Sequence, residues 1–339
     1  MASVTKSFVV SKKGSLSNLQ YRESNIPTLE SNKVLVEVKS IGLNYADLFA
    51  IMGLYSATPK GEFIPGLEYS GVVAESKDTR FAAGDKVIGV TRFGGYTSHI
   101  IADPNYLSPL PYAWTFQEGA AFPVQTLTAY YALVSLADIK PDYTVLIHSA
   151  AGGVGLQANR IAKKFQAFTV GVVGHASKVN VLQEEGFDRV IIRGPDFRQQ
   201  LQEALGGREL NTVLETTGNK YFRYSYDAMA PMGRLISFGS AHFTPAHDRP
   251  NYLTLIWKYL TRPKIDPLSM IPANKAVMGF NLIWLYERLE LLRKLLKEIN
   301  GLDLPPPRIG HEFEFDSLPE ALRFFKVGKS IGKIIINVN

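Results

Sequence analysis

A short buried-strand pattern joined to a helical pattern through a turn of small residues constrains this chain most. Thr144 to His148 is β-branched and apolar, as expected of a strand covered on both faces. Leu156 to Phe165 carries an apolar stripe at helical spacing. The turn between them, Ala150 to Gly155, reads Ala-Ala-Gly-Gly-Val-Gly. This part of the chain is therefore expected to form a strand–turn–helix unit.

The turn has the properties of a phosphate site. The first N–H groups of a helix are free to donate, and the helix dipole favours negative charge there. The spacing resembles G-x-G-x-x-G, with Ala150 at the first glycine. A tight turn without a ligand is the alternative interpretation. We expect a dinucleotide pyrophosphate to contact Ala151, Gly152, Gly153, Val154 and Gly155.

Strands and helices continue to alternate as far as Gly239. The expected strands are 144–148, 168–173, 189–192, 212–215 and 234–238, and the expected helices are 156–165, 177–185, 197–205 and 221–230. This alternation predicts an α/β fold, a parallel sheet with helices on both faces. Its ligand is expected at the carboxyl ends of the strands, along Gly152, Gly174, Gly218 and Gly239. For Gly218, ordinary loop punctuation is an equally open interpretation.

Composition excludes several classes of protein. The 339 residues, 46% hydrophobic and 20% charged, suit two soluble domains. The net charge of +6 is scattered along the chain, which favours a solvated surface over a nucleic-acid footprint. Cysteine is absent, so disulfides, thiolate metal sites and a cysteine nucleophile are excluded. No apolar run has membrane-spanning length and no signal-peptide core is present, so we expect a cytoplasmic protein without a membrane span.

The sequence on either side of this unit predicts a second, β-rich domain. Short alternating strands are expected at 33–40, 69–74, 86–90 and 96–101. Helices are expected at 286–299 and 318–325, and strands at 311–315 and 333–338. The last strand needs a sheet to join, and the N-terminal one is available. We therefore predict a dinucleotide-binding domain over 124–284, inserted into a catalytic domain made of 1–123 and 285–339, with the active cleft between them.

Several motifs together resemble the medium-chain dehydrogenase/reductase family over essentially the whole chain. They are Asn44–Asp47, Pro65–Gly71, Ala83–Val87, Gly94–Tyr96, Thr126–Tyr130 and Ala150–Gly155. Within that family the pattern is similar to the zinc-free quinone oxidoreductase branch. The segment Asn274–Leu282 and the preceding Leu253–Leu268 insertion resemble the vesicle-amine-transport-protein subgroup.

The resemblance implies a fold and a reaction. It implies a GroES-like β-rich catalytic domain and a Rossmann doubly wound parallel-sheet domain. It also implies NADPH as the hydride donor, a quinone or enone as the small-molecule substrate, and a homodimer formed through the edge strand near Val277 to Leu282.

The residues also argue against a metal site. The zinc-dependent relatives use cysteine and histidine ligands, whereas this chain has no cysteine and carries Leu67 where they have a histidine. None of the six histidines pairs at a ligand spacing, so no metal ligand is predicted. Without a Lewis acid a simple alcohol is a poor substrate. Quinones and enones suit such a site better, because their carbonyl needs only hydrogen-bond polarisation while hydride adds.

The candidate catalytic residues are Asn44, an uncharged amide donor, and Tyr55, a phenol that donates at neutral pH. The resemblance places both on the nicotinamide side of the cleft. Asn44 as a loop-fixing residue and Tyr55 as a packed aromatic remain alternatives. Asp47 is expected to be a helix cap or an ion-pair partner, and Glu68 to be structural. Thr128, Phe238 and Gly239 are further candidates for cofactor contact.

Cofactor preference is predicted at the end of the second strand. NAD-binding relatives of this architecture carry an acid there for the ribose hydroxyl, and here Gly174 and His175 occupy that place. Ser177, Lys178 and Arg193 follow and offer donors to a 2′-phosphate. Lys178 as a solvated helix residue is the alternative. Relatives often have a tyrosine where Arg193 stands, which leaves the geometry of the phosphate contact open.

Two functions remain open on the sequence. The first is a zinc-independent NADPH-dependent oxidoreductase that reduces quinones or α,β-unsaturated carbonyls. The alternative is an NADPH-binding protein with little turnover that acts through lipid or protein interaction. The apolar segment Tyr252–Leu260 fits a membrane-contact patch, a lid over the substrate or dimer packing, and packing is the preferred interpretation.

Overall fold

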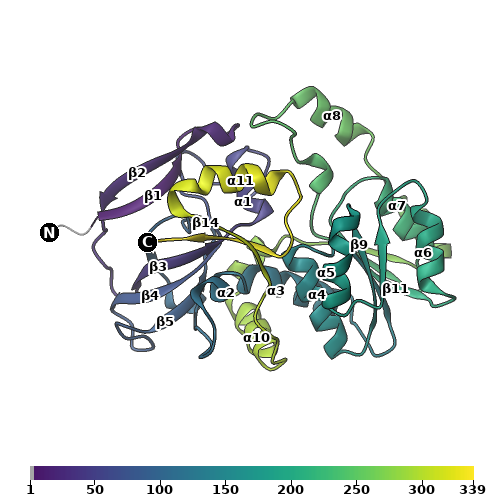
Figure 1. The fold of residues 1–339 in the computed structure, drawn as a ribbon, viewed down its shortest axis with the longest axis horizontal. Coiled ribbons are helices and arrows are strands. Elements are labelled where there is room, and N and C mark those ends of the chain that lie inside the picture. The colour runs from purple at the N-terminus through teal and green to yellow at the C-terminus, as the bar shows by residue number, and fades with distance from the viewer. Residues whose placement is uncertain (1–3) are drawn as a thin grey trace. The chain divides into compact units, whose positions relative to one another are not determined.

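The computed structural model describes residues 4–339 and contains two compact units. Among the described residues, the first unit comprises 4–124, 245–251 and 306–339, and the second comprises 125–244 and 252–305. Both are drawn in Figure 1. The expected mixed α/β architecture, with a β-rich domain and a parallel-sheet domain, is confirmed.

The first unit is built on a mixed sheet with the strand order β14–β15–β3–β4–β5–β7, and β6 also pairs with β3. Its strands are β3 (Val34–Gly42), β4 (Glu68–Ser76), β5 (Lys86–Val90), β6 (His99–Ala102), β7 (Leu107–Pro109), β14 (Ile309–Glu314) and β15 (Lys333–Asn337). The C-terminal strand β15 joins β3 in antiparallel fashion, as the sequence predicted. Alternate residues of β3, Val34, Val36 and Val38, are buried in the core.

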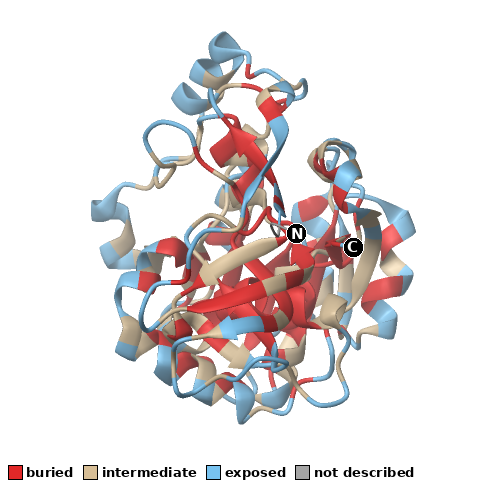
Figure 2. Cartoon of the chain, turned by 90° about the vertical axis from the view of Figure 1, so that its left-hand side faces the viewer, coloured by how far each residue is buried: buried red, intermediate tan, exposed pale blue. Residues whose placement is uncertain are grey.

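Shorter elements cover this sheet. They are the antiparallel hairpin of β1 (Val4–Val10) and β2 (Leu19–Asn25), and the helices α1 (Tyr45–Ile51), α2 (Phe116–Ala120) and α11 (Leu318–Lys326). Leu318 and Leu322 of α11 are one helical turn apart, and both are buried in the same core as β3. Figure 2 shows burial concentrated along strands, while helices carry exposed outer faces.

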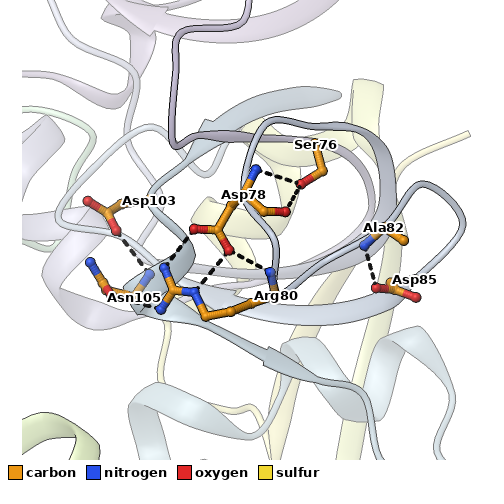
Figure 3. Close-up of polar contacts among 7 residues, drawn as sticks. All are labelled: Ser76, Asp78, Arg80, Ala82, Asp85, Asp103 and Asn105. Carbon is orange, nitrogen blue, oxygen red and sulfur yellow. Dashed lines mark hydrogen bonds and ion pairs between the residues drawn. The ribbon is translucent and has the colours of Figure 1, made fainter.

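Polar contacts fix the turn between β4 and β5 (Figure 3). Asp78 accepts bonds from the guanidinium of Arg80 at 2.9 and 3.0 Å, and Arg80 also donates to the Asn105 side chain at 2.9 Å. Asp103 accepts from the Asn105 backbone N–H at 2.9 Å. Asp78, Asp103 and Asn105 are half-buried, and the contacts join this turn to the segment that precedes β7, so we assign them a structural role.

The second unit is a parallel sheet with the order β10–β9–β8–β11–β12–β13. The strands are β8 (Thr144–His148), β9 (Phe168–Val173), β10 (Arg189–Ile192), β11 (Leu210–Glu215), β12 (Arg234–Ser237) and β13 (Ala276–Gly279). Val170, Val213 and Leu235 are fully buried, as strands covered on both faces require. The strand order reverses between β8 and β11, the place where ligands bind in sheets of this kind.

Helices connect these strands. They are α3 (Pro123–Tyr130), α4 (Gly153–Lys164), α5 (Val179–Glu184), α6 (Phe197–Leu205), α7 (Lys220–Ala228), α8 (Tyr252–Leu260), α9 (Pro267–Ala273) and α10 (Leu289–Asn300). The helix α10 belongs to the second unit, where the Tyr130 hydroxyl donates to Glu298 at 3.2 Å. The second compact unit therefore extends to residue 305, and the domain boundary expected at 285 remains a prediction.

The helix α8 leaves large apolar side chains in contact with solvent. Leu253 is 80% exposed and Trp257 is 67% exposed. Lys258 anchors the helix by donating to the His242 carbonyl at 2.7 Å. Within residues 4–339 we find no helix with both the length and the apolarity to cross a membrane.

Candidate functional site

The turn after β8 is held by backbone bonds at the edge of the sheet. Gly152 caps α4 in an extended conformation, and its N–H donates to the Ser149 carbonyl at 2.9 Å. The N–H of Ala150 donates to Val172, at the end of β9, at 3.1 Å. Ser149 has a left-handed φ of 53°, a conformation that costs energy for a residue other than glycine. The chain thus turns sharply where β8 ends.

Packing restricts side chains at Gly153 and Gly155. A Cβ added at Gly155 would lie 2.6 Å from backbone atoms of Ala150. A Cβ added at Gly153 would lie 1.7 Å from Oε1 of Gln125, a side chain that is 2% exposed. A larger residue is therefore excluded at Gly155 by backbone, and at Gly153 it would have to displace the buried Gln125 side chain, which suits a cradle for a pyrophosphate.

Two hydroxyl residues that the sequence analysis missed meet at the switch point between β8 and β11. The side-chain oxygens of Ser149 and Thr216 are 3.0 Å apart. Each residue follows directly after its strand, and neighbouring parallel strands end at the same edge of the sheet. Their position directly after an expected strand is the sequence signal by which they could have been found.

The end of β11 is organised by Glu215, which is fully buried. Its carboxylate accepts from the N–H groups of Thr217 at 2.9 Å and Gly218 at 3.0 Å, and from the Thr217 hydroxyl. Burial raises the pKa of Glu215, and these bonds oppose that rise. Gly218 adopts a φ of 70°, which favours glycine. Loop geometry therefore gives Gly218 a structural reason to be there.

The loop after β12 lies against the loop after β11. The N–H of Ala241 donates to the Thr216 carbonyl at 2.9 Å, and a Cβ added at Gly239 would meet the Thr216 side chain at 3.2 Å. The ring of Phe238 packs against Phe280 with centroids 5.5 Å apart. Thr128, on α3, is buried in the same unit. The structure thus brings Gly218, Phe238 and Gly239 to one edge of the sheet.

The ends of β9 and β10 carry the candidate residues for cofactor preference. Gly174, His175 and Ser177 are exposed, and a Cβ added at Gly174 would meet nothing within 4 Å. Lys178, in contrast, is 9% exposed and is not a solvated helix residue. The backbone N–H of Arg193 donates to Val173 at 2.8 Å, next to Gly174.

Lys178 and Arg193 form a desolvated positive site. Burial lowers the pKa of Arg193, and Tyr221 and then Glu215 oppose this. Burial also lowers the pKa of Lys178, and the Arg193 charge lowers it further. His148, whose Nε2 lies 2.8 Å from the Ser225 hydroxyl, has its pKa lowered to about 3 by burial and by Arg193, so it is neutral. Partial burial of two like charges that act on each other is costly, and a nearby anion would offset that cost.

In the first unit, the amide of Asn44 is engaged in a buried polar network. Its nitrogen donates to the Gly42 carbonyl at 3.2 Å and to Glu68 at 2.9 Å, and its oxygen accepts from the Lys333 ammonium at 2.8 Å. Lys333 also pairs with Glu68, which in addition accepts from the Val124 N–H at 2.8 Å. This is the loop-fixing arrangement that the sequence analysis kept as an alternative.

Asp47 completes the capping box at the start of α1, whose N-cap residue is Asn44. Its carboxylate accepts from the Asn44 backbone N–H at 2.8 Å and from the Tyr96 hydroxyl at 3.0 Å. Burial raises the pKa of Asp47 to about 7, although both bonds and Lys333 lower it. Tyr55, just after α1, packs as a half-buried side chain against the core of the first unit.

The histidine and acidic side chains do not gather into a metal centre. From residue 4 to residue 339, no group of three or more histidine, cysteine, aspartate or glutamate side chains is arranged to hold a metal ion. Leu67, at the position of the expected histidine, is buried and 4% exposed.

Family models match both units. The model described as "Alcohol dehydrogenase GroES-like domain" matches residues 30–112, and the one described as "Zinc-binding dehydrogenase" matches residues 153–265. The order and position of these matches agree with the two architectures described above.

Relatives and solved structures resemble nearly the whole chain. The Synaptic vesicle membrane protein VAT-1 homolog of Danio rerio is 32% identical over 316 residues, which cover 91% of this chain and 65% of the relative. The homolog of Rattus norvegicus is 30% identical over 325 residues, covering 94% of this chain and 80% of the relative. The quinone oxidoreductase of Thermus thermophilus, solved also in complex with NADPH, has a TM-score of 0.78 and 27% identity, over 98% of this chain and 99% of that one.

Proposed function

The chain belongs to the medium-chain dehydrogenase/reductase superfamily of oxidoreductases, with quinone oxidoreductase-like and VAT-1-like relatives, and we propose that it reduces quinones or α,β-unsaturated carbonyls with NADPH and without zinc. One observation carries this proposal. Two desolvated cations, Lys178 and Arg193, stand beside Gly174, where an NAD-specific site would have an acid.

The residues of the second unit fit a dinucleotide. The glycine turn at the start of α4 offers free N–H donors, and the close contacts at Gly153 and Gly155 keep side chains out of it. The 2′-phosphate would be held by Lys178 and Arg193. The Nε of Arg193 is buried and has no hydrogen-bond partner among the described residues, which supports a missing anionic partner.

When bound, NADPH supplies the hydride. The chain's own contribution, in this proposal, is to orient the substrate carbonyl and to donate a hydrogen bond as negative charge develops on its oxygen. We propose Tyr55 as that donor. Asn44 uses its amide hydrogens on Gly42 and Glu68, so we propose that it holds the loop leading to Tyr55 and donates to substrate only if that network opens.

The proposal of zinc independence is supported by the donor groups. Glu68, the acid beside Leu67, is occupied by Lys333, Asn44 and the Val124 N–H. A carboxylate paired with a buried ammonium is a poor ligand, because binding a metal would leave that ammonium unpaired. Leu67 supplies no donor atom at all.

Anaerobic NADPH oxidation against a panel of quinones and enones tests the reaction, with cofactor binding measured in the same preparations. Turnover with at least one substrate class is expected. Tight NADPH binding without turnover across the panel would refute the reductase proposal and favour a cofactor-binding protein that acts through lipid or protein interaction.

The cofactor assignment has its own test in Lys178→Ala and Arg193→Ala. If each cation makes a charge-assisted contact, its loss weakens NADPH binding by about 10- to 150-fold and leaves NADH nearly unchanged. Titration of both cofactors against both variants measures this. Equal affinity of the wild type for NADH and NADPH would contradict the assignment.

A further inference from the structure

The Arg193 guanidinium is placed by an aromatic ring. Its central carbon lies 5.4 Å from the centroid of the Tyr221 ring, within the range of a cation–π contact. Its backbone is fixed by the bond to Val173, and its Nε has no hydrogen-bond partner in the described part of the chain. The ring is therefore the contact that orients the cation.

Tyr221 is itself held from several sides. It is 8% exposed, and its N–H donates to the Asn219 side chain at 3.0 Å. Its hydroxyl reaches the Gly194 carbonyl at 3.5 Å, directly after Arg193. Its ring meets Phe197 edge-on with centroids 5.0 Å apart. A ring fixed in this way offers a face of defined position to Arg193.

An aromatic face differs from a carboxylate as a support for this cation. A paired carboxylate would neutralise Arg193 and take up its donors, as salt bridges do elsewhere in the chain. The face of Tyr221 attracts the guanidinium through the ring quadrupole and leaves its charge and its N–H donors for an anion. Glu215, the nearby acid that favours the charged form of Arg193, is already saturated by Thr217 and Gly218.

We propose that Tyr221 is a positioning residue for cofactor selection, because its ring holds Arg193 at the ends of β9 and β10 in the orientation that receives the 2′-phosphate of NADPH. This inference rests on the proposed function, since it requires Arg193 to bind that phosphate. It assigns part of the NADPH preference to α7, a helix whose sequence carries no cofactor motif.

The same helix offers a matched control. Tyr224 lies one turn along α7, contacts Phe197 and Tyr221 in the same aromatic cluster, and stacks on a different cation, Arg198, at 4.3 Å. Tyr224→Leu therefore removes one neighbour of the aromatic cluster while the Tyr221 ring under Arg193 is kept. Tyr221→Phe keeps the face and removes only the hydroxyl.

The experiment measures Kd for NADPH and NADH in the wild type and in Tyr221→Leu, Tyr221→Phe, Tyr224→Leu and Arg193→Ala. Tyr221→Leu is expected to weaken NADPH by about 3- to 30-fold while NADH binding is unchanged, as the loss of one desolvated cation–π contact predicts. Tyr221→Phe and Tyr224→Leu should keep the wild-type ratio of the two constants. In the double variant Tyr221→Leu/Arg193→Ala, the NADPH constant should equal that of Arg193→Ala alone.

The two proposals fail in different ways. If Arg193→Ala leaves the NADPH to NADH ratio unchanged, the phosphate site itself is refuted. If Arg193→Ala changes that ratio and Tyr221→Leu does not, or weakens both cofactors equally, only the positioning role is refuted. Should Tyr221→Leu not fold, Tyr221→Met fills the space with a flexible apolar chain and no π face, and the same ratios decide.

Discussion

At the scale of single residues, we propose that Gly174 governs which dinucleotide the site accepts. An added Cβ there meets nothing within 4 Å, and the backbone is not in the left-handed region, so a side chain is tolerated. Gly174→Asp should lower NADPH affinity by roughly 10- to 100-fold and raise NADH affinity, because the new carboxylate repels a phosphate and accepts from a ribose hydroxyl. Titration with both cofactors measures this.

The neutral variant Gly174→Ala is the control for Gly174→Asp and should bind both cofactors as the wild type does. A loss of NADPH binding in the alanine variant equal to that in the aspartate variant would show that space, and not charge, governs this position.

Asp47 should make the stability of the protein depend on pH. Its pKa, raised to about 7 by burial, exceeds the ordinary value near 4, so the folded state binds this proton more tightly than the unfolded state. The free energy of unfolding should therefore fall as pH rises from about 4 through about 7. Asp47→Asn lacks this titration. Between pH 5 and pH 8 the wild type should therefore lose roughly 2 kcal/mol of unfolding free energy relative to the variant.

Urea unfolding of both proteins across this pH range measures the Asp47 effect. Parallel stability curves for the wild type and Asp47→Asn would contradict the raised pKa. Glu68, whose charge also raises the pKa of Asp47, is present in both proteins, so the difference between them isolates Asp47.

At the scale of elements, the strands that are buried on both faces could be predicted from the sequence. The bounds of β8, β9 and β10 agree with the expected strands, since these strands are short, apolar and closed by turn residues. The hairpin of β1 and β2 was not predicted, because β2 is mostly exposed and carries Gln20, Arg22 and Glu23 without an apolar alternation. Its strand conformation depends on pairing with β1, which is a tertiary contact.

In the candidate site too, residues with a local sequence signal were predicted and residues defined by tertiary contacts were not. Gly153 and Gly155 were predicted because a turn of small residues follows a strand, and the structure supplies the packing reason. Tyr221 and Glu215 were not singled out, since nothing local distinguishes a tyrosine under an arginine or a glutamate at the end of a strand. Their contacts come from segments that are distant in sequence: Tyr221 of α7 meets Arg193, which follows β10, and Glu215 ends a strand that pairs with β8.

At the scale of the whole molecule, activity and folding should survive strong chelation. The chain has no cysteine, and Glu68 is committed to Lys333. We expect unchanged NADPH oxidation and an unchanged unfolding midpoint after treatment with a chelator, under conditions that inactivate a zinc-dependent dehydrogenase used as a control. Elemental analysis showing one zinc per chain would overturn this prediction.

The parallel sheet of the second unit also predicts how two copies of the chain associate. β13 pairs with β12 on one side, and within residues 4–339 it is the terminal strand of that sheet, so its other edge is open to pairing with a second copy. The N–H groups of Ala276 and Phe280 donate toward β12, which turns the N–H of Val277 outward.

We therefore predict a homodimer joined through β13. Val277→Pro removes one outward donor and spares the bonds to β12, so it should shift the protein toward monomer, whereas Val277→Ala should remain dimeric. Light scattering at micromolar concentration measures this, and a monomeric wild type, or a Val277→Pro dimer as stable as the wild type, would contradict the prediction.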